Sequence, residues 1–414
     1  MVRMNTTPGA NRLHIGIFGR TNSGKSSFIN ALANQQVSIV ADVAGTTTDP
    51  VYKAMELHPL GACTIIDTAG FDDATSLGEA RLEKTRLAAE RTDLAVLVLP
   101  ADSALKEEPE AFFAGELEWY RYFRKQDKPV LFLVSQLDKD RKQAEILTGW
   151  LRERTGEEAL AVSASSKEGM EEVRTALAKK MPESFGQRRI TEGLVEDGDL
   201  VLLVMPQDIQ APKGRLILPQ VQTIRELLDR KCLVMSSTAD RLADALNQLV
   251  QPPKLIVTDS QVFGYVYEHK PKESMLTSFS VLFAAYKGDL AYYVEGARQL
   301  DALTENSHVL IAECCTHAPL EEDIGRVKLP RMLKKRVGPG LAVQVAGGTD
   351  FPEDLTNYDL IIQCGACMFN RSYVMARIER ARGQGVPMTN YGVAIAHLTG
   401  ILEQIALPGQ AERG

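Results

Sequence analysis

The chain has no excess of positive charge and no long apolar run. Its 414 residues carry 47 Lys and Arg against 54 Asp and Glu, which gives a net charge of −7 and a pI near 5.6. Proteins that bind nucleic acid or anionic membranes through charge need a basic surface, which this balance does not supply. No apolar segment approaches the roughly 18 residues of a membrane span, and residues 1–7 contain no apolar signal core. We therefore expect a cytoplasmic protein with neither nucleic acid nor a membrane as a partner.

Cysteine is also scarce, with six residues at positions 63, 232, 314, 315, 364 and 367. In a long chain of this kind, clustered cysteines indicate metal or redox chemistry more often than a disulfide framework. Cys63 and Cys232 stand alone in strand-like apolar segments, so we expect both to be small buried hydrophobic residues. Composition is otherwise typical of globular proteins, and the length predicts about three domains.

A phosphate-binding loop follows the first apolar segment of the chain. Residues 14–18 predict a strand, and residues 19–26, Gly-Arg-Thr-Asn-Ser-Gly-Lys-Ser, match the P-loop pattern ahead of a helical stretch. In this pattern backbone amides near the two glycines cradle phosphates at the helix N-terminus. Lys25 is expected to reach the β and γ phosphates, and Ser26 to bind Mg²⁺. The expected nucleotide contacts are Gly19, Asn22, Ser23, Gly24, Lys25, Ser26 and Ser27.

Two further segments supply the other expected magnesium and γ-phosphate contacts. Asp67 follows a strand-like segment and is predicted to be a carboxylate of the Mg²⁺ shell, while the amide of Gly70 would sense the γ-phosphate. The polar loop of residues 44–49 holds three threonines, of which Thr47 is the expected Mg²⁺ ligand. The candidate catalytic residues are Lys25, Thr47, Asp67 and Gly70.

Asp138 lies where guanine-specific GTPases carry the aspartate of Asn-Lys-x-Asp. Its carboxylate can accept hydrogen bonds from guanine N1–H and the exocyclic amine, a pairing that adenine does not offer. The first two positions of the motif hold Ser135 and Gln136 instead of Asn and Lys, so we expect the amide that anchors this loop and the lysine stem over the base to be lost. The sequence therefore predicts a guanine preference with weakened affinity, and a base pocket completed by Ser163 and Ala164.

These motifs resemble the translation-factor-type GTPases of the TrmE and Era group. Phe71 stands where many switch GTPases carry a glutamine that orients the attacking water. In the TrmE-like branch, the asparagine that matches Asn22 and the backbone of the first switch loop hold a K⁺ ion where other enzymes place an arginine. The resemblance implies slow, K⁺-stimulated GTP hydrolysis with Asn22 as a K⁺ ligand.

The middle of the chain predicts a small α/β unit without an active site. Three strand-like segments, 200–204, 232–235 and 254–257, alternate with helical patterns. A three-stranded sheet leaves two exposed edges and a small core. Pairing with a second copy of the chain would cover an edge, and packing against the chain's own neighbours is an equal alternative.

From about residue 273, strands alternate with amphipathic helices, which predicts a doubly wound parallel sheet. One strand-like segment, 309–312, leads to Cys315-Thr316-His317, and another, 360–362, leads to Cys364-Gly365-Ala366-Cys367. Loops that leave parallel strands share one edge of the sheet, where open α/β sheets bind their ligands. We therefore expect the three cysteines to converge on one centre.

Three thiolates with one other ligand suit either a structural zinc or an iron–sulfur cluster. Structural zinc usually stabilises small modules that lack a core, whereas this domain has its own sheet and helices. A cluster with three thiolates and a weak fourth ligand leaves one iron exchangeable, which suits a carrier. His317 or Glu322 is the candidate fourth ligand, and Cys314 is expected to face away from Cys315.

The combination of a TrmE-like GTPase, a middle unit and this cysteine set resembles the HydF family of [FeFe]-hydrogenase maturation GTPases over the whole chain. The resemblance implies a [4Fe–4S] cluster on Cys315, Cys364 and Cys367, besides GTP, Mg²⁺ and K⁺, and a homodimer joined through the middle domain. It further implies a scaffold that accepts a di-iron precursor made with two radical-SAM maturases and delivers it to apo-[FeFe]-hydrogenase.

The expected fold is α/β throughout. It comprises a P-loop GTPase domain over residues 1–184, a small α/β dimerisation domain over 188–272, and a doubly wound parallel α/β cluster-binding domain over 273–414. Two alternatives stay open: a zinc-containing regulatory GTPase, and an RNA-associated GTPase, against which the acidic charge stands.

Overall fold

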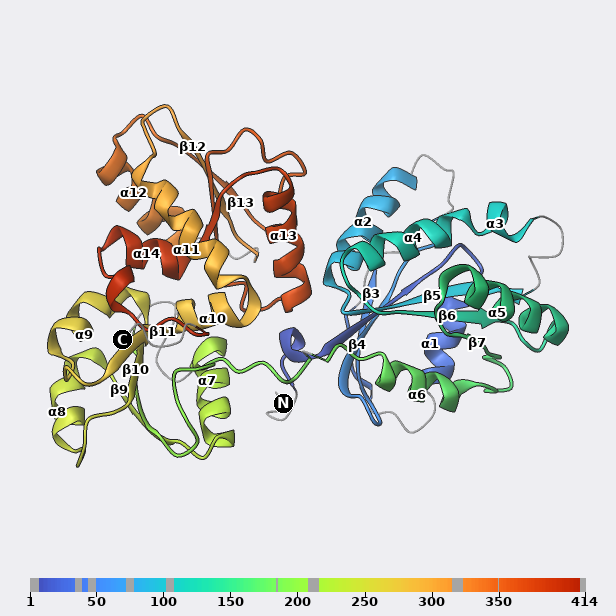
Figure 1. Cartoon of the computed structure of the whole chain (residues 1–414), viewed down its shortest axis with the longest axis horizontal. Coiled ribbons are helices and arrows are strands. Elements are labelled where there is room, and N and C mark those ends of the chain that lie inside the picture. Colours follow the sequence, from blue (N-terminus) through green and yellow to red (C-terminus); the bar gives the residue numbers. More distant parts are fainter. Residues whose placement is uncertain are drawn as a thin grey trace. The chain divides into compact units, whose positions relative to one another are not determined.

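The fold is that of a computed structural model, which describes residues 7–33, 39–43, 50–71, 78–101, 108–183, 185–207, 216–314, 323–348 and 350–409. The chain divides into two compact units, Met1–Gln187 and Arg188–Gly414 (Figure 1). No helix within the described ranges combines the length and the apolar character needed to cross a bilayer.

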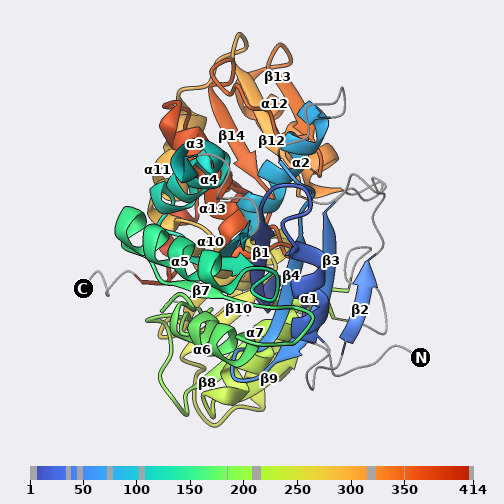
Figure 2. The same ribbon diagram turned by 90° about the vertical axis from the view of Figure 1, so that its right-hand side faces the viewer.

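The first unit is built on a seven-stranded sheet with the order β2-β3-β4-β1-β5-β6-β7. The pairs β2–β3 and β3–β4 are antiparallel and the remaining neighbours are parallel. Figure 2 shows β2 at the outer edge beside β3. The strands are β1 (Leu13–Phe18), β2 (Ile39–Val43), β3 (Val51–Leu57), β4 (Gly61–Asp67), β5 (Leu94–Pro100), β6 (Val130–Ser135) and β7 (Ala159–Ala161).

Helices cover both faces of this sheet, so its central strands are continuous apolar runs. Phe28 and Val173, from two helices on one face, pack in a core with Ile15. On the other face, Trp119 and Leu147 pack in a second core with Phe132. The helices are α1 (Lys25–Ala33), α2 (Gly78–Arg91), α3 (Pro109–Phe112), α4 (Ala114–Lys125), α5 (Arg141–Thr155) and α6 (Met170–Lys179).

The second unit begins with a parallel four-stranded sheet in the order β11-β10-β8-β9. Its strands are β8 (Leu200–Val204), β9 (Leu233–Ser237), β10 (Leu255–Thr258) and β11 (Met275–Ser278), and its helices are α7 (Leu218–Asp229), α8 (Leu242–Asn247) and α9 (Phe263–His269). The sequence predicted three strands here, with the next domain beginning at residue 273. The fourth strand escaped that prediction because its four residues run directly into a helix.

A second parallel sheet of the same unit has the order β13-β12-β14-β15. Its strands are β12 (His308–Ala312), β13 (Ala342–Ala346), β14 (Leu360–Gln363) and β15 (Met388–Asn390), and its helices are α10 (Phe279–Lys287), α11 (Leu290–Arg298), α12 (Leu329–Val337), α13 (Arg371–Gly383) and α14 (Tyr391–Leu398). The predicted parallel α/β sheet is confirmed. The last helix, α14, begins at Tyr391, where the Asn390 side chain caps it by accepting from the Gly392 amide.

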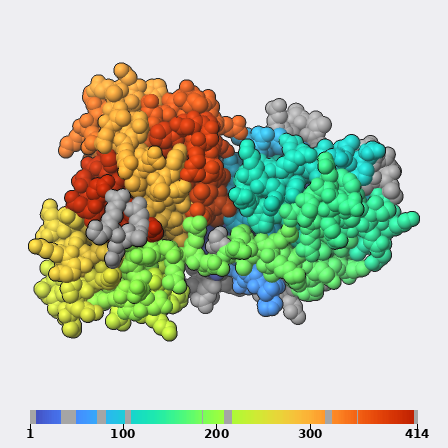
Figure 3. Space-filling model, in the orientation of Figure 1, coloured from blue at the N-terminus to red at the C-terminus, as the bar shows by residue number. Residues whose placement is uncertain are grey.

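The two sheets of the second unit share one apolar core. Leu202 and Ile256 of the first sheet belong to the same buried cluster as Leu310 and Ile361 of the second. Helix α10 directly follows β11 and packs against α7, α11, α13 and α14 (Figure 1). On the face shown in Figure 3, the yellow-green surface of the first sheet's region continues into the orange and red surface of the second. The region that carries the cysteines is therefore not packed independently of the middle region.

Candidate functional site

The predicted phosphate loop is closed around its own lysine. Lys25 is buried, and its Nζ atom donates to the carbonyl oxygens of Gly19 (2.9 Å) and Arg20 (2.8 Å). A Cβ atom at Gly19 would lie 2.4 Å from the Val98 carbonyl oxygen, so only glycine fits between the loop and β5. The P-loop that the sequence predicts therefore connects β1 to the start of α1, and the Lys25 ammonium group is held inside the loop.

Two side chains that the sequence predicts as Mg²⁺ ligands meet. Ser26 Oγ at the start of α1 donates to Asp67 Oδ2 at the end of β4, with 2.8 Å between them. Burial raises the pKa of Asp67, and the hydrogen bond from Ser26 and the charge of Lys25 oppose that rise. The third predicted ligand, Thr47, lies outside the described residues.

Gly70 and Phe71 lie between the phosphate loop and α4. A Cβ atom on Gly70 would come within 2.5 Å of the Thr21 amide nitrogen, so the Gly70 backbone lies directly against the loop. The Phe71 ring packs toward α4, with its centroid 6.4 Å from that of Trp119. Phe71 therefore contributes an apolar contact and no polar atom to the predicted site.

The base-binding loop is anchored to the phosphate loop, contrary to the sequence prediction. Ser135 Oγ donates to the Ser23 carbonyl oxygen at 2.6 Å, so a hydroxyl makes the tie that was predicted lost with the missing asparagine. Gln136 Nε2 donates to the Asn22 carbonyl oxygen at 3.2 Å, and Lys139 Nζ donates to Gln136 Oε1 at 2.7 Å. The substituted motif thus holds the same two loops together by different atoms.

Asp138 is presented as an ionised acceptor. Its carboxylate accepts hydrogen bonds from Ser163 Oγ (2.7 Å) and Ser165 Oγ (2.9 Å), and these bonds hold its pKa below the usual value. Ser163 is buried and the neighbouring Ala164 is partly buried. The residues predicted to form the base pocket therefore lie together.

One tie of the phosphate loop was missed from the sequence. Arg20 donates from Nε and Nη2 to the two carboxylate oxygens of Glu116 at 2.9 and 3.0 Å, and its guanidinium lies 3.9 Å from the ring centroid of Phe112. Glu116, on α4, is fully buried. No local pattern could have identified the pair, because 96 residues separate its members.

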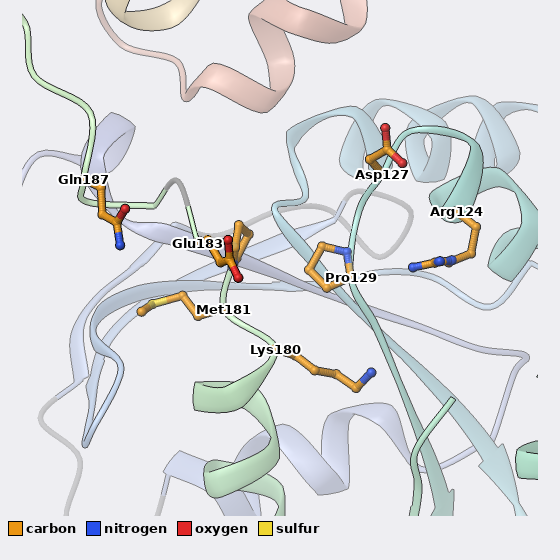
Figure 4. A pocket seen from close by; sticks show the side chains of 8 residues that line it. Arg124, Asp127, Pro129, Lys180, Met181, Glu183 and Gln187 are labelled. Carbon is orange, nitrogen blue, oxygen red and sulfur yellow. The ribbon is translucent and has the colours of Figure 1, made fainter. Parts of the chain in front are cut away.

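A hollow of about 680 Å³ in the first unit lies away from the phosphate loop. It opens beside Pro129, just before β6, whereas the base loop begins at the other end of β6 (Figure 4). Lys180 in its wall pairs with Glu157 at 2.6 Å. The lining residues are Arg124, Asp127, Pro129, Lys180, Met181, Pro182, Glu183 and Gln187. The hollow therefore lies at the opposite edge of the sheet from the predicted nucleotide contacts.

The second cysteine loop lies beside the end of β12. The Cys364 amide donates to the Ala312 carbonyl oxygen at 2.9 Å, and Cys364 Sγ accepts from the amides of Cys314 (3.2 Å) and Ala366 (3.4 Å). β12 and β14 are adjacent and β13 lies on the other side of β12, so the strand order reverses between β12 and β14, as at the ligand crevices of open α/β sheets. Cys364 therefore touches the residue that precedes Cys315.

The described residues contain only part of the predicted metal site. Cys364 and Cys367 belong to one loop, whereas Cys315, His317 and Glu322 lie outside the described residues. In the described ranges no three His, Cys, Asp or Glu side chains gather at one point. The hydrogen bond with Cys314 and those from the backbone lower the pKa of Cys364 to about 7, which favours the thiolate that binds metal.

The two remaining isolated cysteines are buried as predicted. Cys63 is fully buried and Cys232 is 5% exposed. Burial raises the pKa of the Cys63 thiol to about 12, so this group stays protonated.

Two buried cations tie the cysteine segments, and neither was predicted. Arg377 on α13 donates to Cys314 Sγ (3.4 Å), to the Gly348 carbonyl oxygen (2.6 Å) and to the Tyr373 hydroxyl (2.8 Å). Lys287 Nζ donates to the carbonyl oxygens of Ala366 (3.0 Å), Cys367 (2.9 Å) and Phe369 (2.9 Å). Arg377 and Lys287 are 1% and 2% exposed, so both charges are held inside the protein.

Comparison with known proteins adds GTPases that are similar to part of this chain. The chain is 37% identical to GTPase Der of Nitratiruptor over 115 residues, which are 27% of this chain and 24% of that protein. It is 28% identical to GTPase Der of Myxococcus xanthus over 251 residues, 59% of this chain and 51% of that protein. It is 42% identical to the tRNA modification GTPase MnmE of Xanthomonas oryzae over 90 residues, 22% of this chain and 20% of that protein. The chain thus spans between about a fifth and a half of these relatives.

Among solved structures, Era of Aquifex aeolicus bound to GDP and AlF4⁻ aligns with a TM-score of 0.34 and 17% identity, covering 56% of this chain and 97% of that one. The G domain of the FeoB iron transporter of T. maritima aligns with a TM-score of 0.32 and 19% identity, covering 41% of this chain and 99% of that one.

Three family descriptions match successive parts of the chain. Residues 14–136 match the 50S ribosome-binding GTPase family, so the first unit carries a GTPase domain. Residues 190–288 match the hydrogen maturase F dimerization domain, and residues 291–408 match the hydrogen maturase F tetramerization domain. The two hydrogen maturase F matches together cover more than half of the chain. With its GTPase domain followed by both of these domains, the chain belongs to the hydrogen maturase F (HydF) family of hydrogenase maturation GTPases.

Proposed function

We propose that this protein hydrolyses GTP, carries a [4Fe–4S] cluster on Cys315, Cys364 and Cys367, and passes a di-iron precursor to apo-[FeFe]-hydrogenase. The precursor would come from two radical-SAM maturases, as the family resemblance implies. One observation supports the cluster most directly: Cys364 Sγ accepts a hydrogen bond from the amide of Cys314, the residue before Cys315. The residue that leads into Cys315 therefore contacts the second cysteine loop at the edge of the sheet where the sequence predicts a shared ligand.

The described donors fit an iron–sulfur cluster. Amide hydrogen bonds to Cys364 Sγ stabilise a thiolate, and hydrogen bonds to the sulfurs are among the features that tune such clusters. The buried charges of Lys287 and Arg377 offset the negative charge of thiolates in a region of low dielectric. When bound, a cluster with one weakly held iron would supply the exchangeable coordination position that a carrier needs.

In the nucleotide site, hydrogen bonds between protein groups would be replaced by hydrogen bonds to GTP. Lys25 would exchange its carbonyl partners for phosphate oxygens, and Asp138 would exchange serine hydroxyls for guanine donors. Ser26, Thr47 and Asp67 would hold Mg²⁺, which neutralises charge on the phosphates. Any serine bond that is given up as guanine binds would reduce the net gain from binding, in the direction of the predicted weaker guanine affinity.

Asn22 would hold K⁺ beside the phosphates, as the TrmE resemblance implies. Phosphate release from GTP is expected to be faster in KCl than in NaCl at equal ionic strength, and Asn22→Ala should lose that difference. Equal rates of the natural protein in both salts would remove the K⁺ proposal and leave the GTPase itself standing.

The exposed edge of β9 is the surface proposed for the homodimer. Leu233 on β9 is 64% exposed, and Val221 and Leu228 on α7 are about half exposed, so an unpaired edge strand lies beside apolar side chains. Leu233→Glu should halve the mass measured by light scattering. Ile146 of the first unit has the size of leucine and a similar exposure. Ile146→Glu is therefore the matched control and should leave the mass unchanged.

Anaerobic reconstitution with iron and sulfide tests the cluster. The natural protein should absorb near ~400 nm, and Cys315→Ala, Cys364→Ala and Cys367→Ala should each lose that absorbance and the bound iron. Cys232→Ala, outside the proposed site, is the control and should keep both. A colourless protein that binds zinc through the same three cysteines would contradict the carrier role and favour the zinc-containing alternative.

A further inference from the structure

Lys287 is a buried lysine whose partners all belong to the second cysteine loop. It ends helix α10, and its ammonium group donates to three carbonyl oxygens, those of Ala366, Cys367 and Phe369, at 2.9 to 3.0 Å. An ammonium group has three N–H donors, and three carbonyl acceptors match them. Burial of a lysine at 2% exposure is costly unless the charge is satisfied in this way.

The three acceptors fix the path of the chain through the cysteine loop. Ala366 has a φ of 46°, a left-handed conformation that a residue with a side chain adopts at a cost. The Phe369 amide also donates to the Ala366 carbonyl oxygen at 3.0 Å, so this oxygen is shared by a turn and by the lysine. Lys287 thus stabilises Ala366, the strained residue that lies between the two cysteines and directly precedes Cys367.

A second tie runs beside the first and in the opposite direction. Arg371, at the start of α13, donates from Nη1 to the Gly288 carbonyl oxygen at 2.6 Å. At the end of α10, Lys287 therefore donates to the cysteine loop, and Gly288 accepts from Arg371 in the helix that follows this loop. Because α10 lies within the stretch matching the dimerization domain and the loop lies within the tetramerization domain, both ties cross between the two.

We propose that Lys287 is a positioning residue for the cluster: it holds the peptides of the Cys364–Cys367 loop so that both thiolates keep the geometry that grips iron. The inference rests on the proposed cluster function and adds to it a residue from outside the stretch that matches the tetramerization domain. Partners of this kind, behind the ligands of a metal site, are worth about 10- to 100-fold in metal affinity. Lys287 further makes α10, the last helix within the stretch that matches the dimerization domain, part of the cluster site.

A graded series at position 287 tests the inference. Lys287→Arg keeps the charge and the donors, Lys287→Gln keeps two donors without charge, and Lys287→Met keeps neither. After anaerobic reconstitution, the readouts are iron per chain, the rate at which a chelator bleaches the protein, and the midpoint potential of the bound cluster. We expect the Lys287→Met variant to bleach about tenfold faster than the natural protein. The bleaching rate of Lys287→Gln should be intermediate, and that of Lys287→Arg should be nearest to the natural rate.

Lys128→Met is the matched control, since Lys128 is a buried lysine of the first unit that also donates to two carbonyl oxygens. It should leave bleaching and potential unchanged. If Lys287→Met does not fold, Gln against Arg decides by the same readouts. Bleaching rates and potentials that do not differ across the series would overturn the positioning role.

The outcome is separable from that of the cluster proposal. If the natural protein binds iron and the cysteine variants do not, but the series at Lys287 is flat, only the positioning role fails. If the natural protein binds no iron, the cluster proposal fails with it, and the series then has no cluster to position.

Discussion

The predicted nucleotide site and the cysteine site lie at equivalent places in two different sheets, but different interactions hold their loops. In the first unit, hydroxyl groups tie the phosphate loop to the base loop, through Ser135 and Ser23, and to the end of β4, through Ser26 and Asp67. A charged pair, Arg20 with Glu116, ties the same loop to α4. In the second unit, the cysteine segments are tied by the buried cations Lys287 and Arg377. Both sites follow the carboxyl ends of parallel strands.

The difference matches what each site is proposed to do. A hydrogen bond between neutral groups, such as that from Ser135 to the Ser23 carbonyl oxygen, contributes about 0.5–1.5 kcal/mol, so it can be exchanged when GTP arrives. Hydrogen bonds from a charged group contribute about 1.5–3 kcal/mol, and removing the cation leaves buried acceptors unsatisfied. The nucleotide site is therefore built to change partners, whereas the cysteine site is built to keep its backbone in place.

The largest expected effect separates the two sites by function. Lys25→Met should lower GTP hydrolysis by about 100- to 1,000-fold, because the only ammonium group in the phosphate loop sequence is lost. Iron bound per chain after reconstitution should stay at the natural level. Phosphate release and iron content, measured on the same preparation, check both parts. A loss of iron in this variant would show that the two sites are not separate, and the comparison would break.

The next effect concerns the stability of the cysteine region. Arg377→Met should destabilise the second unit by about 3 kcal/mol, because the carbonyl oxygen of Gly348 and the hydroxyl of Tyr373 lose a charged donor inside the protein. Arg382→Met on the same helix is the control: Arg382 pairs with Asp289 and Glu379 at the surface, so it should cost less than about 1 kcal/mol. Urea unfolding followed by circular dichroism measures both. Equal losses would mean that the buried cation is no stronger a tie than a surface pair.

The elements that the sequence predicted well are those whose signal is local. The P-loop needs a strand, two glycines and Lys25-Ser26 in sequence, and the structure has them between β1 and α1. Strand β8 has the predicted bounds, and β14 extends the predicted segment 360–362 by one residue, because each is a short apolar run that a parallel sheet covers on both faces. The hydrogen maturase F family was likewise predicted from motifs spread along the chain, and the family matches confirm it.

What the sequence could not give depends on contacts between distant residues. Lys287 ends an apolar helix, where a lysine is expected for its interaction with the helix dipole, and nothing nearby in sequence indicates that it reaches residue 367. The Ser135 anchor was missed for the same reason, since its partner lies 112 residues away. The roles of Cys315, His317, Glu322 and Thr47 stay predictions, because these residues lie outside the described ranges.

A smaller effect is expected from the hydroxyl ties. Ser135→Ala removes the bond to the Ser23 carbonyl oxygen and should weaken GTP binding by up to about tenfold. Ser135→Asn, which restores the residue usual at this position of the motif, should bind GTP at least as tightly as the natural protein. Titration with a fluorescent GTP analogue measures the dissociation constants, with Thr148→Ala on the surface of α5 as the control. If Ser135→Ala binds as tightly as the natural protein, the hydroxyl is not an anchor for the base loop.

The smallest expected effect tests whether any buried cation influences a functional site, or only a cation whose acceptors lie in the loop of that site. The first unit has its own in Lys128, which donates to the carbonyl oxygens of Ala89 (2.7 Å) and Glu90 (3.2 Å) before the start of β6. Burial lowers the pKa of Lys128 from 10.5 to about 8. Between these two pH values the unfolded chain keeps a proton that the folded chain releases, so the contribution of Lys128 to stability rises with pH.

In Lys128→Met this pH dependence is absent. The difference in free energy of unfolding between the natural protein and the variant should therefore shift by about 1 kcal/mol in favour of the natural protein between pH 8 and pH 9. Urea unfolding at both pH values measures the shift. A difference that does not change with pH would mean that Lys128 keeps its charge in both states, and burial alone would then not distinguish it from a surface lysine. If the shift occurs while Lys128→Met hydrolyses GTP and binds iron as the natural protein does, burial of a cation is not enough to affect a site. The acceptors of the cation must then belong to the loop of that site, as those of Lys287 do.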